Sequence, residues 1–196
     1  MSFEALTPPA PGEVTAIVPG PDDGAAAALS PVLAAAAAGG RAYRVVPAAV
    51  VGARDLSTAA NLRLAGALPA GPAREAWLRP LPELVARLER PWHELGHAER
   101  YLAGVARARL AAVDLVVLEL PAGRLPGPRV VQLIRDLTGE GTGVLWLDRR
   151  LRLVADFAIP VWLLDAGVLV GPLEPATLAR DERARRLALG GRLGAR

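Results

Sequence analysis

Short apolar runs bounded by turn-forming residues recur along the chain, and each predicts a buried strand. The run at 115–118 directly follows Asp114, and the run at 143–147 has the same uninterrupted apolar character. Runs of this kind are typical of strands that a parallel sheet buries on both faces. Further strands are expected at 13–18, 44–46 and 161–164, the last forming a hairpin-like pair with 168–170.

The segments between these strands predict helices. One begins among the alanines at 25–28, where Pro31 is compatible only with a first turn or a kink. Residues 55–110 have a helical pattern, broken at the cluster 69–72 and at Pro80, Pro82 and Pro91. Later helices are expected at 128–137, at 151–157 and, rich in arginine, at 174–189. Strands that alternate with helices indicate an α/β fold with a mostly parallel sheet and an inserted helical block.

Composition narrows the kind of protein. A hydrophobic content of 52% over 196 residues suits one globular domain with a real core and argues against disorder. The absence of cysteine excludes disulfides and thiolate metal sites. The N-terminus lacks the pattern of a signal peptide, and the alanine-rich run at 24–40 is too short to span a membrane. A cytoplasmic protein is therefore expected.

The distribution of the charged residues indicates whether the chain binds nucleic acid. All 23 basic residues are arginines, and the formal net charge is +3. Acidic residues are interspersed among them, as in the sequence RDER at 180–183. A nucleic-acid-binding surface instead gathers its basic residues on one face, with aromatic residues between them. The pattern indicates a solvated surface, and no nucleic-acid partner is expected.

Five segments follow one another in an order that matches a known family. They are PGEVTAIVPG at 11–20, DLSTAANLRLAG at 55–66, ELGHAERYLAGVARARL at 94–110, DLVVLELP at 114–121 and DLTGEGTGVLWLDRRLRLVADFAIPVWLLDAGVLVGP at 136–172. In that order they resemble the strand before the phosphate loop, the stretch after the Q-loop, the signature segment, the Walker B strand and the last third of an ABC-transporter ATP-binding domain. The last of these is most similar to the branched-chain amino acid uptake type.

This resemblance implies a reduced P-loop NTPase, or ABC ATPase-like, fold. Residues 1–50 and 110–196 would form a truncated RecA-like α/β core, and residues 51–109 would form a helical subdomain with the signature segment. Relative to the family, a stretch between Gly40 and Val46 is missing, so much of the antiparallel sheet that holds the adenine in the family is not expected here.

The phosphate loop has lost the residues that hold ATP in this family. Phosphoryl transfer needs a lysine and backbone amides on the phosphates, a hydroxyl and a carboxylate on magnesium, and a group that orients water. Ala26 stands at the lysine position and Ala27 at the position of the magnesium-binding hydroxyl. Asp22 adds negative charge between the loop residues Gly20 and Gly24, and the chain has no lysine elsewhere.

The other nucleotide-site motifs are degenerate as well. Glu119 stands where the magnesium-binding aspartate belongs, Leu120 replaces the catalytic glutamate, and Arg149 replaces the switch histidine. Ala48 takes the place of the Q-loop glutamine, and Pro126 that of the D-loop aspartate. The degenerate signature, which in the family caps the γ-phosphate bound by a partner subunit, consists of Leu95, Gly96, His97, Ala98 and Glu99.

These losses predict a catalytically inactive pseudo-ATPase with a structural or regulatory role in a transporter or ATPase complex. The resemblance implies a homodimer, or a heterodimer with an intact ABC ATPase. It also implies a contact with a membrane permease through residues 51–92, at the inner face of the membrane. No cofactor is expected. The alternative is a subunit that binds ATP and magnesium without turnover.

A rival pattern comes from a different class of protein. The sequence HELGH at 93–97 fits H-E-x-x-H, in which two histidines one helical turn apart bind zinc and the glutamate activates water. His93 and His97 are the only histidines of the chain, but Arg100 and Ala103 occupy the remaining positions of the extended pattern. The resemblance also places 93–95 before the helix, so the two histidines would not share its face. A zinc-dependent hydrolase is therefore the distant alternative, and no bound metal is expected.

Overall fold

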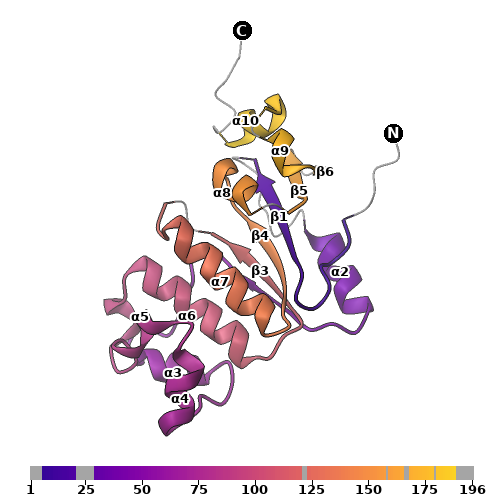
Figure 1. Cartoon of the computed structure of the whole chain (residues 1–196). Helices are drawn as coiled ribbons and strands as arrows, with labels where there is room; N and C mark the ends of the chain where they lie inside the picture. Colours follow the sequence, from indigo (N-terminus) through magenta and orange to yellow (C-terminus); the bar gives the residue numbers. More distant parts are fainter. Residues whose placement is uncertain are drawn as a thin grey trace.

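The computed structural model describes residues 6–20, 29–120, 123–157, 159–165, 168–178 and 180–188. Its strands are β1 Val14–Pro19, β2 Tyr43–Val46, β3 Leu115–Glu119, β4 Gly143–Leu147, β5 Val161–Asp165 and β6 Val168–Leu173. They form a six-stranded sheet in the order β2–β3–β4–β1–β5–β6. The first five strands are parallel and β6 runs antiparallel to β5, which confirms the expected α/β fold (Figure 1).

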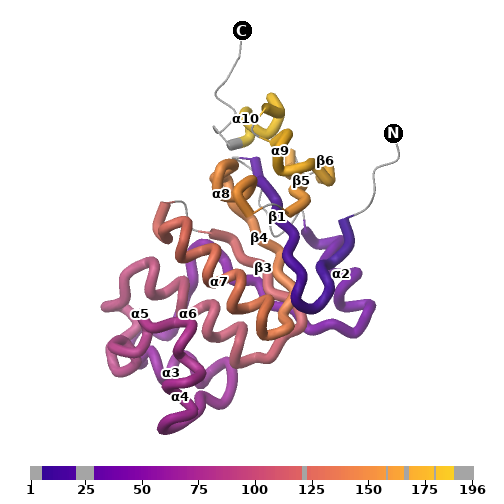
Figure 2. Tube along the Cα trace, in the orientation of Figure 1, coloured from indigo at the N-terminus to yellow at the C-terminus, as the bar shows by residue number. Residues whose placement is uncertain are grey.

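Strands from the two ends of the chain meet in the middle of this sheet. β1 pairs with β4 on one side and with β5 on the other. The tube in Figure 2 shows the indigo β1 beside the orange β4 and β5. The carboxyl ends of these parallel strands therefore meet at one edge of the sheet, where open α/β sheets bind their ligands.

The helices lie close to the positions expected from the sequence, with one exception. They are α2 Ser30–Ala38, α3 Thr58–Arg63, α4 Gly71–Leu78, α5 Pro82–Val85, the 3₁₀-helix η1 Trp92–Glu94, α6 His97–Leu110, α7 Gly127–Gly139, α8 Leu151–Asp156, α9 Pro175–Leu178 and α10 Glu182–Ala188. Pro31 lies in the first turn of α2, where its missing N–H removes no helical hydrogen bond. Residues 25–28, where this helix was expected to begin, lie outside the described ranges.

The exception is the arginine-rich C-terminal segment. A single helix over 174–189 was expected, and the structure has the two short helices α9 and α10 instead. The carboxylate of Asp181 accepts a hydrogen bond from the Ala184 N–H at 2.8 Å. An aspartate in this position caps a helix N-terminus, so Asp181 starts a new helix and does not continue the preceding one.

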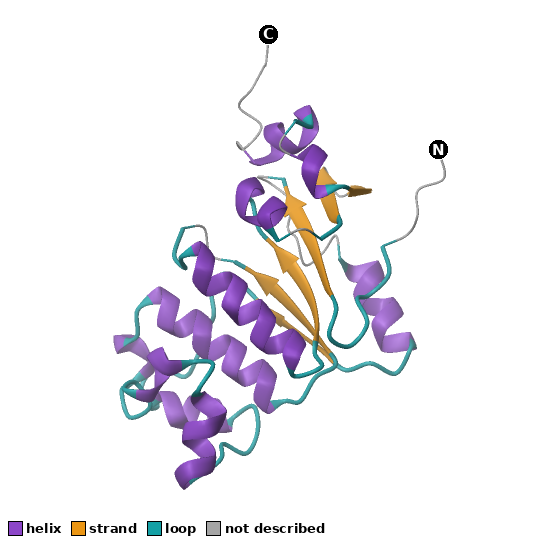
Figure 3. Ribbon diagram, viewed as in Figure 1, coloured by secondary structure: helices purple, strands orange, loops and turns teal. Residues whose placement is uncertain are grey.

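Helices cover both faces of the sheet because its side chains alternate between two apolar faces (Figure 3). Leu118 and Trp146 belong to the larger hydrophobic cluster, which also contains residues of α6 and α7. Val117 and Leu147 point the other way, into a second cluster with residues of α2. No helix in the described part of the chain is long and apolar enough to cross a membrane.

The helical block between β2 and β3 is joined to the sheet by this apolar core. Leu62, Leu84 and Trp92 lie in the same cluster as the sheet residues Leu118 and Trp146. Three of the four tryptophans, Trp92, Trp146 and Trp162, are buried. The fourth, Trp77 on α4, is half-buried, and the guanidinium of Arg109 lies 4.9 Å from its ring centroid.

Candidate functional site

The candidate site lies at the carboxyl edge of the sheet. Gly20 directly follows β1, Glu119 ends β3, and Arg149 lies two residues after β4. Backbone hydrogen bonds hold these ends together. The Leu120 N–H donates to the Leu147 carbonyl at 3.2 Å, and the Gly20 N–H donates to the carbonyl of Leu164 on β5 at 2.8 Å. The described ends of β1, β3 and β4 therefore lie at one edge of the sheet.

Arg149 brings two of the expected positions into direct contact. Its Nη2 donates a hydrogen bond to the Gly20 carbonyl oxygen at 2.6 Å, across 129 residues of sequence. The guanidinium at the switch position thus reaches the backbone at the start of the phosphate-loop segment. The remaining loop positions, Asp22, Gly24, Ala26 and Ala27, lie outside the described residues.

A buried carboxylate beside Arg149 was not among the expected site residues. Asp148 is 6% exposed and accepts hydrogen bonds from the backbone N–H of Arg150 and from its guanidinium, at 2.7 Å for the Nη2–Oδ2 pair. A second guanidinium nitrogen of Arg150 donates to the Leu125 carbonyl at 2.8 Å. The carboxylate therefore anchors the segment after β4 in an ion pair. The sequence could have pointed to Asp148 as a site residue, because it directly follows the apolar run 143–147 at the end of a predicted strand.

The interior next to this edge is apolar. Leu120 is half-buried and packs against the larger hydrophobic cluster. Tyr101 on α6 is fully buried, and its hydroxyl has no hydrogen-bond partner among the described residues. Burial raises the pKa of Tyr101 well above its ordinary value, and the negative charges of Asp148 and Glu119 add to that effect. This phenol is thus held neutral close to the two carboxylates.

The degenerate signature residues stabilise the start of their own helix. Leu95 is buried, and Gly96 precedes the first residue of α6, His97. The Glu99 carboxylate accepts the Gly96 N–H at 2.8 Å and forms an ion pair with Arg87. Burial alone would raise the pKa of Glu99, but the hydrogen bonds from Arg87 and Gly96 outweigh it and lower the pKa below its ordinary value. Ala98 is half-buried beside the apolar core.

The two histidines do not occupy one helical turn. His93 lies in η1 and His97 begins α6, while the backbone of Leu95 and Gly96 between them is extended, with ψ of 139° and 163°. The His93 ring contacts the Arg54 carbonyl, with Nδ1 3.0 Å from its oxygen. The described residues contain no group of three or more His, Cys, Asp or Glu side chains positioned to hold a metal ion. The shared helix face that the zinc pattern needs is therefore not formed.

The loop before α3 is a polar feature that the sequence analysis did not single out. Asn61 is fully buried, and its amide nitrogen donates to the carbonyls of Ala53, Leu56 and Ser57 at 2.9–3.2 Å. Its amide oxygen accepts the Ala53 N–H at 2.8 Å and Nη2 of Arg107 at 2.9 Å. Asn61 is the only asparagine of the chain, which was the signal available in the sequence.

Solved structures with the same arrangement of strands and helices are ABC ATPase domains. A transporter assigned to the metal-chelate ABC type, in an inward-facing conformation, superposes with a TM-score of 0.68 over 90% of this chain and 79% of that one, at 18% identity. The fold is that of an ABC ATPase domain. The ADP conformation of an ATP-binding cassette of an ABC transporter gives a TM-score of 0.61 over 92% of this chain and 89% of the other, at 13% identity.

The same fold also occurs in a protein that acts on the ribosome. The archaeal ribosome recycling factor, solved with a ribosomal stalk protein, matches 86% of this chain and 40% of its own length, with a TM-score of 0.64 and 18% identity. No family model matches the chain, and no curated protein matches its sequence. At these identities the likeness establishes the fold alone.

Proposed function

We propose that this chain is an ABC ATPase-like subunit that does not hydrolyse ATP and has a structural or regulatory role in a transporter or ATPase complex. The observation that supports this most is the chemistry at the carboxyl edge of the sheet. Leu120 follows β3 where the family has its catalytic glutamate, and a leucine side chain cannot polarise water. Leu120 is half-buried and packs against the apolar core.

The residues at the edge do not fit ATP and magnesium. The sequence supplies neither a lysine for the phosphates nor, at Ala27, a hydroxyl for the metal. Glu119 keeps a carboxylate at the magnesium position, but the neighbouring buried carboxylate, Asp148, is already paired with Arg150. Arg149 donates to the Gly20 carbonyl, so this guanidinium stabilises the protein's own backbone.

In this role the subunit would assemble with an intact ABC ATPase, or with a second copy of itself, at the inner face of a membrane. Residues 51–92 would contact the permease. This segment includes α3, α4 and α5, which Figure 1 shows gathered at the end of the molecule away from β6. Val51, Leu56, Leu64 and Val85 within it are exposed large hydrophobic residues, and a partner that covered them would remove their apolar surface from water.

Purified protein is expected to release no phosphate from ATP above background, with or without magnesium. Losing a single acid–base group costs about 10²–10⁴-fold in rate, and several groups are missing here. The measurement is phosphate release by the full chain beside its Glu119→Gln variant, which removes the one retained magnesium-position carboxylate. Equal rates for both proteins are expected. Activity that disappears in Glu119→Gln would contradict the proposal, because a contaminating ATPase would survive that change.

ATP with magnesium is expected to leave the melting temperature unchanged up to about 1 mM, because a ligand stabilises a protein only by binding its folded state. The chain has no lysine to bind the phosphates, Ala27 supplies no hydroxyl for magnesium, and Asp22 adds repulsion in the loop. A thermal-shift titration tests this. A saturable upward shift would favour a nucleotide-binding subunit without turnover. The matched variant is Ala26→Lys with Ala27→Ser, which restores the two missing groups.

A further inference from the structure

A pocket of about 700 Å³ opens beside the C-terminal helix α10, where β5 ends. The described residues that line it are all charged, and they are Asp165 of β5 and Glu182, Arg183, Arg185 and Arg186 of α10. Arginine makes up four of the seven residues in the sequence RDERARR at 180–186. The fold thus turns a stretch of mixed charge into a pocket lined by three guanidiniums.

The helix that carries these arginines is fixed to the core. Ala184 and Leu187 are buried in the larger hydrophobic cluster, which also contains Leu163 of β5. Leu164 belongs instead to the second cluster, with residues of α2. Because neighbouring strand residues point to opposite faces, Asp165 shares the face of Leu163. The pocket therefore lies on the opposite face of the sheet from α2, the helix that follows the phosphate-loop segment.

Asp165 draws two of the guanidiniums together. Its Oδ2 accepts a hydrogen bond from Nε of Arg183 at 2.9 Å and another from Nη2 of Arg186 at 2.7 Å. The Asp165 side chain is 21% exposed, against 39% and 50% for the two arginines, so the carboxylate lies deeper than the guanidiniums. A guanidinium has five N–H donors, and each of these two uses one nitrogen for Asp165. Their other donors are open to the pocket.

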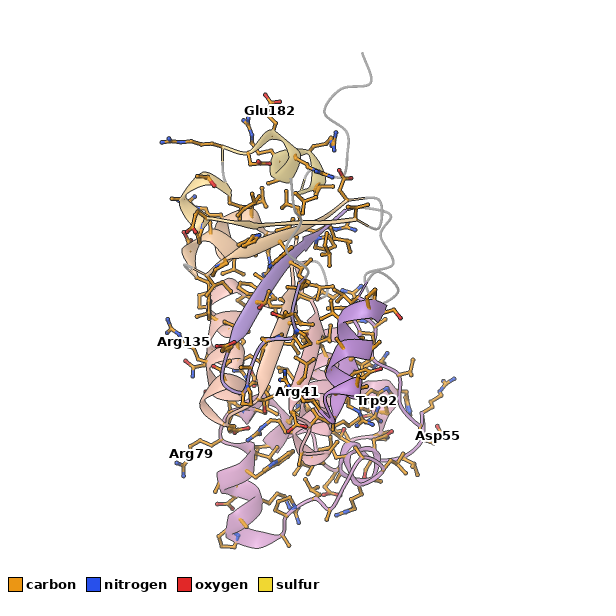
Figure 4. All side chains as sticks on the ribbon, turned by 90° about the vertical axis from the view of Figure 1, so that its right-hand side faces the viewer. Arg41, Asp55, Arg79, Trp92, Arg135 and Glu182 are labelled. Carbon is orange, nitrogen blue, oxygen red and sulfur yellow. The ribbon has the colours of Figure 1, made fainter. Side chains whose placement is uncertain are left out.

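The pocket keeps an excess of positive charge. One carboxylate, Asp165, serves two arginines, and the third, Arg185, is exposed and forms no ion pair within the described ranges. Glu182 forms none there either, and it lies in the first turn of α10 at the outer end of the molecule (Figure 4). An anion that enters the pocket therefore meets guanidiniums whose charge is only partly balanced.

We propose that this pocket binds a phosphate group, free or as the ester of a small metabolite. A phosphate ester has three acceptor oxygens and a charge of about −1.5 to −2 at pH 7, and arginines bind such oxygens through charge-assisted hydrogen bonds. Asp165 holds Arg183 and Arg186 in place beforehand, which lowers the entropy cost of binding. No aromatic side chain of the described residues lines the pocket, so a nucleotide base has no ring to stack on. The inference goes beyond the proposed function.

The test is a titration of the full chain with glycerol 3-phosphate, inorganic phosphate and succinate at constant ionic strength, followed by the arginine Nε–H signals in nitrogen-15 spectra. Both phosphates are expected to shift the signals of Arg183 and Arg186 saturably, with a Kd on the order of 5 mM because exposed ion pairs contribute little each. The tighter of the two identifies the ligand as an ester or as free phosphate. Succinate is expected to bind about 5-fold more weakly, because its charges lie on two separate carboxylates.

Matched variants separate the pocket from the general charge of this end of the chain. Arg186→Gln is expected to weaken both phosphates about 5-fold, and Arg185→Gln, which has no ion pair to lose, about 3-fold without a change in stability. Arg180→Gln removes an exposed arginine outside the lining and should leave both affinities unchanged. The proposal is overturned by an equal effect of Arg180→Gln, by succinate that binds as tightly, or by no saturable shift up to about 50 mM.

This pocket and the phosphate loop can be told apart. At a Kd on the order of 5 mM, 1 mM of any phosphate ligand fills about one sixth of the pocket, so the pocket adds no saturable shift to the titration with ATP and magnesium. A saturable shift with ATP that persists in Arg186→Gln would contradict the proposed function alone. A chain that is inactive toward ATP and shows no saturable shift with either phosphate would overturn only the pocket.

Discussion

Replacing Trp146 by alanine is expected to lower the free energy of unfolding by about 3–5 kcal/mol. Trp146 is fully buried on β4 and meets Phe157 edge-on, with ring centroids 5.5 Å apart at 70°. Its indole N–H has no acceptor among the described residues, so the expected loss comes from packing and from the cavity left behind. Urea denaturation followed by circular dichroism measures the change.

Trp77→Ala is the matched control for this substitution. Trp77 is half-buried and stacks under the guanidinium of Arg109, an interaction worth about 0.5–1 kcal/mol at an exposed site. Trp77→Ala is expected to lower the free energy of unfolding by less than half as much as Trp146→Ala. Similar losses at both positions would mean that β4 is not at the centre of the core.

The second large effect is expected at Asn61. Asn61→Ala removes the amide's hydrogen bonds to the carbonyls of Ala53, Leu56 and Ser57, each of which keeps a backbone donor. It also takes away the amide oxygen that accepts the Ala53 N–H and Nη2 of Arg107. An unsatisfied buried group costs about 1–3 kcal/mol, and we expect a total loss of about 2–4 kcal/mol because the loop can relax partly toward water. Denaturation of the full chain in urea measures the loss.

Gln132, the only glutamine of the chain, provides the control for Asn61. It is exposed on α7, and its amide donates to the Asp136 carboxylate at 2.7 Å. Gln132→Ala is expected to change stability by no more than about 0.5 kcal/mol. A loss at Asn61→Ala as small as this would show that the loop at 51–57 does not depend on the buried amide.

The strands could be predicted from the sequence because burial on both faces leaves a direct signal. The runs at 115–118 and 143–147 are apolar without interruption, and they form β3 and β4 within one residue of the expected bounds. The split between α9 and α10 was missed because arginine, alanine and leucine all favour helix, and that propensity concealed the capping role of Asp181.

The candidate site could be predicted only as a set of positions. The order of the motifs placed Glu119, Leu120 and Arg149 at strand ends, and the structure has them there. The hydrogen bond from Arg149 to Gly20 could not be predicted, because it depends on β4 lying next to β1.

The central place of β1 has a consequence for synthesis on the ribosome. Among the described strands β1 is made first, and both of its neighbours in the sheet, β4 and β5, come from the last third of the sequence. Domains fold as units while they are synthesised, so this apolar strand has both edges unpaired until most of the protein has been translated. An unpaired strand edge is a template for aggregation. Both edges of Val14–Pro19 are therefore expected to stay exposed on the nascent chain until β4 has been made.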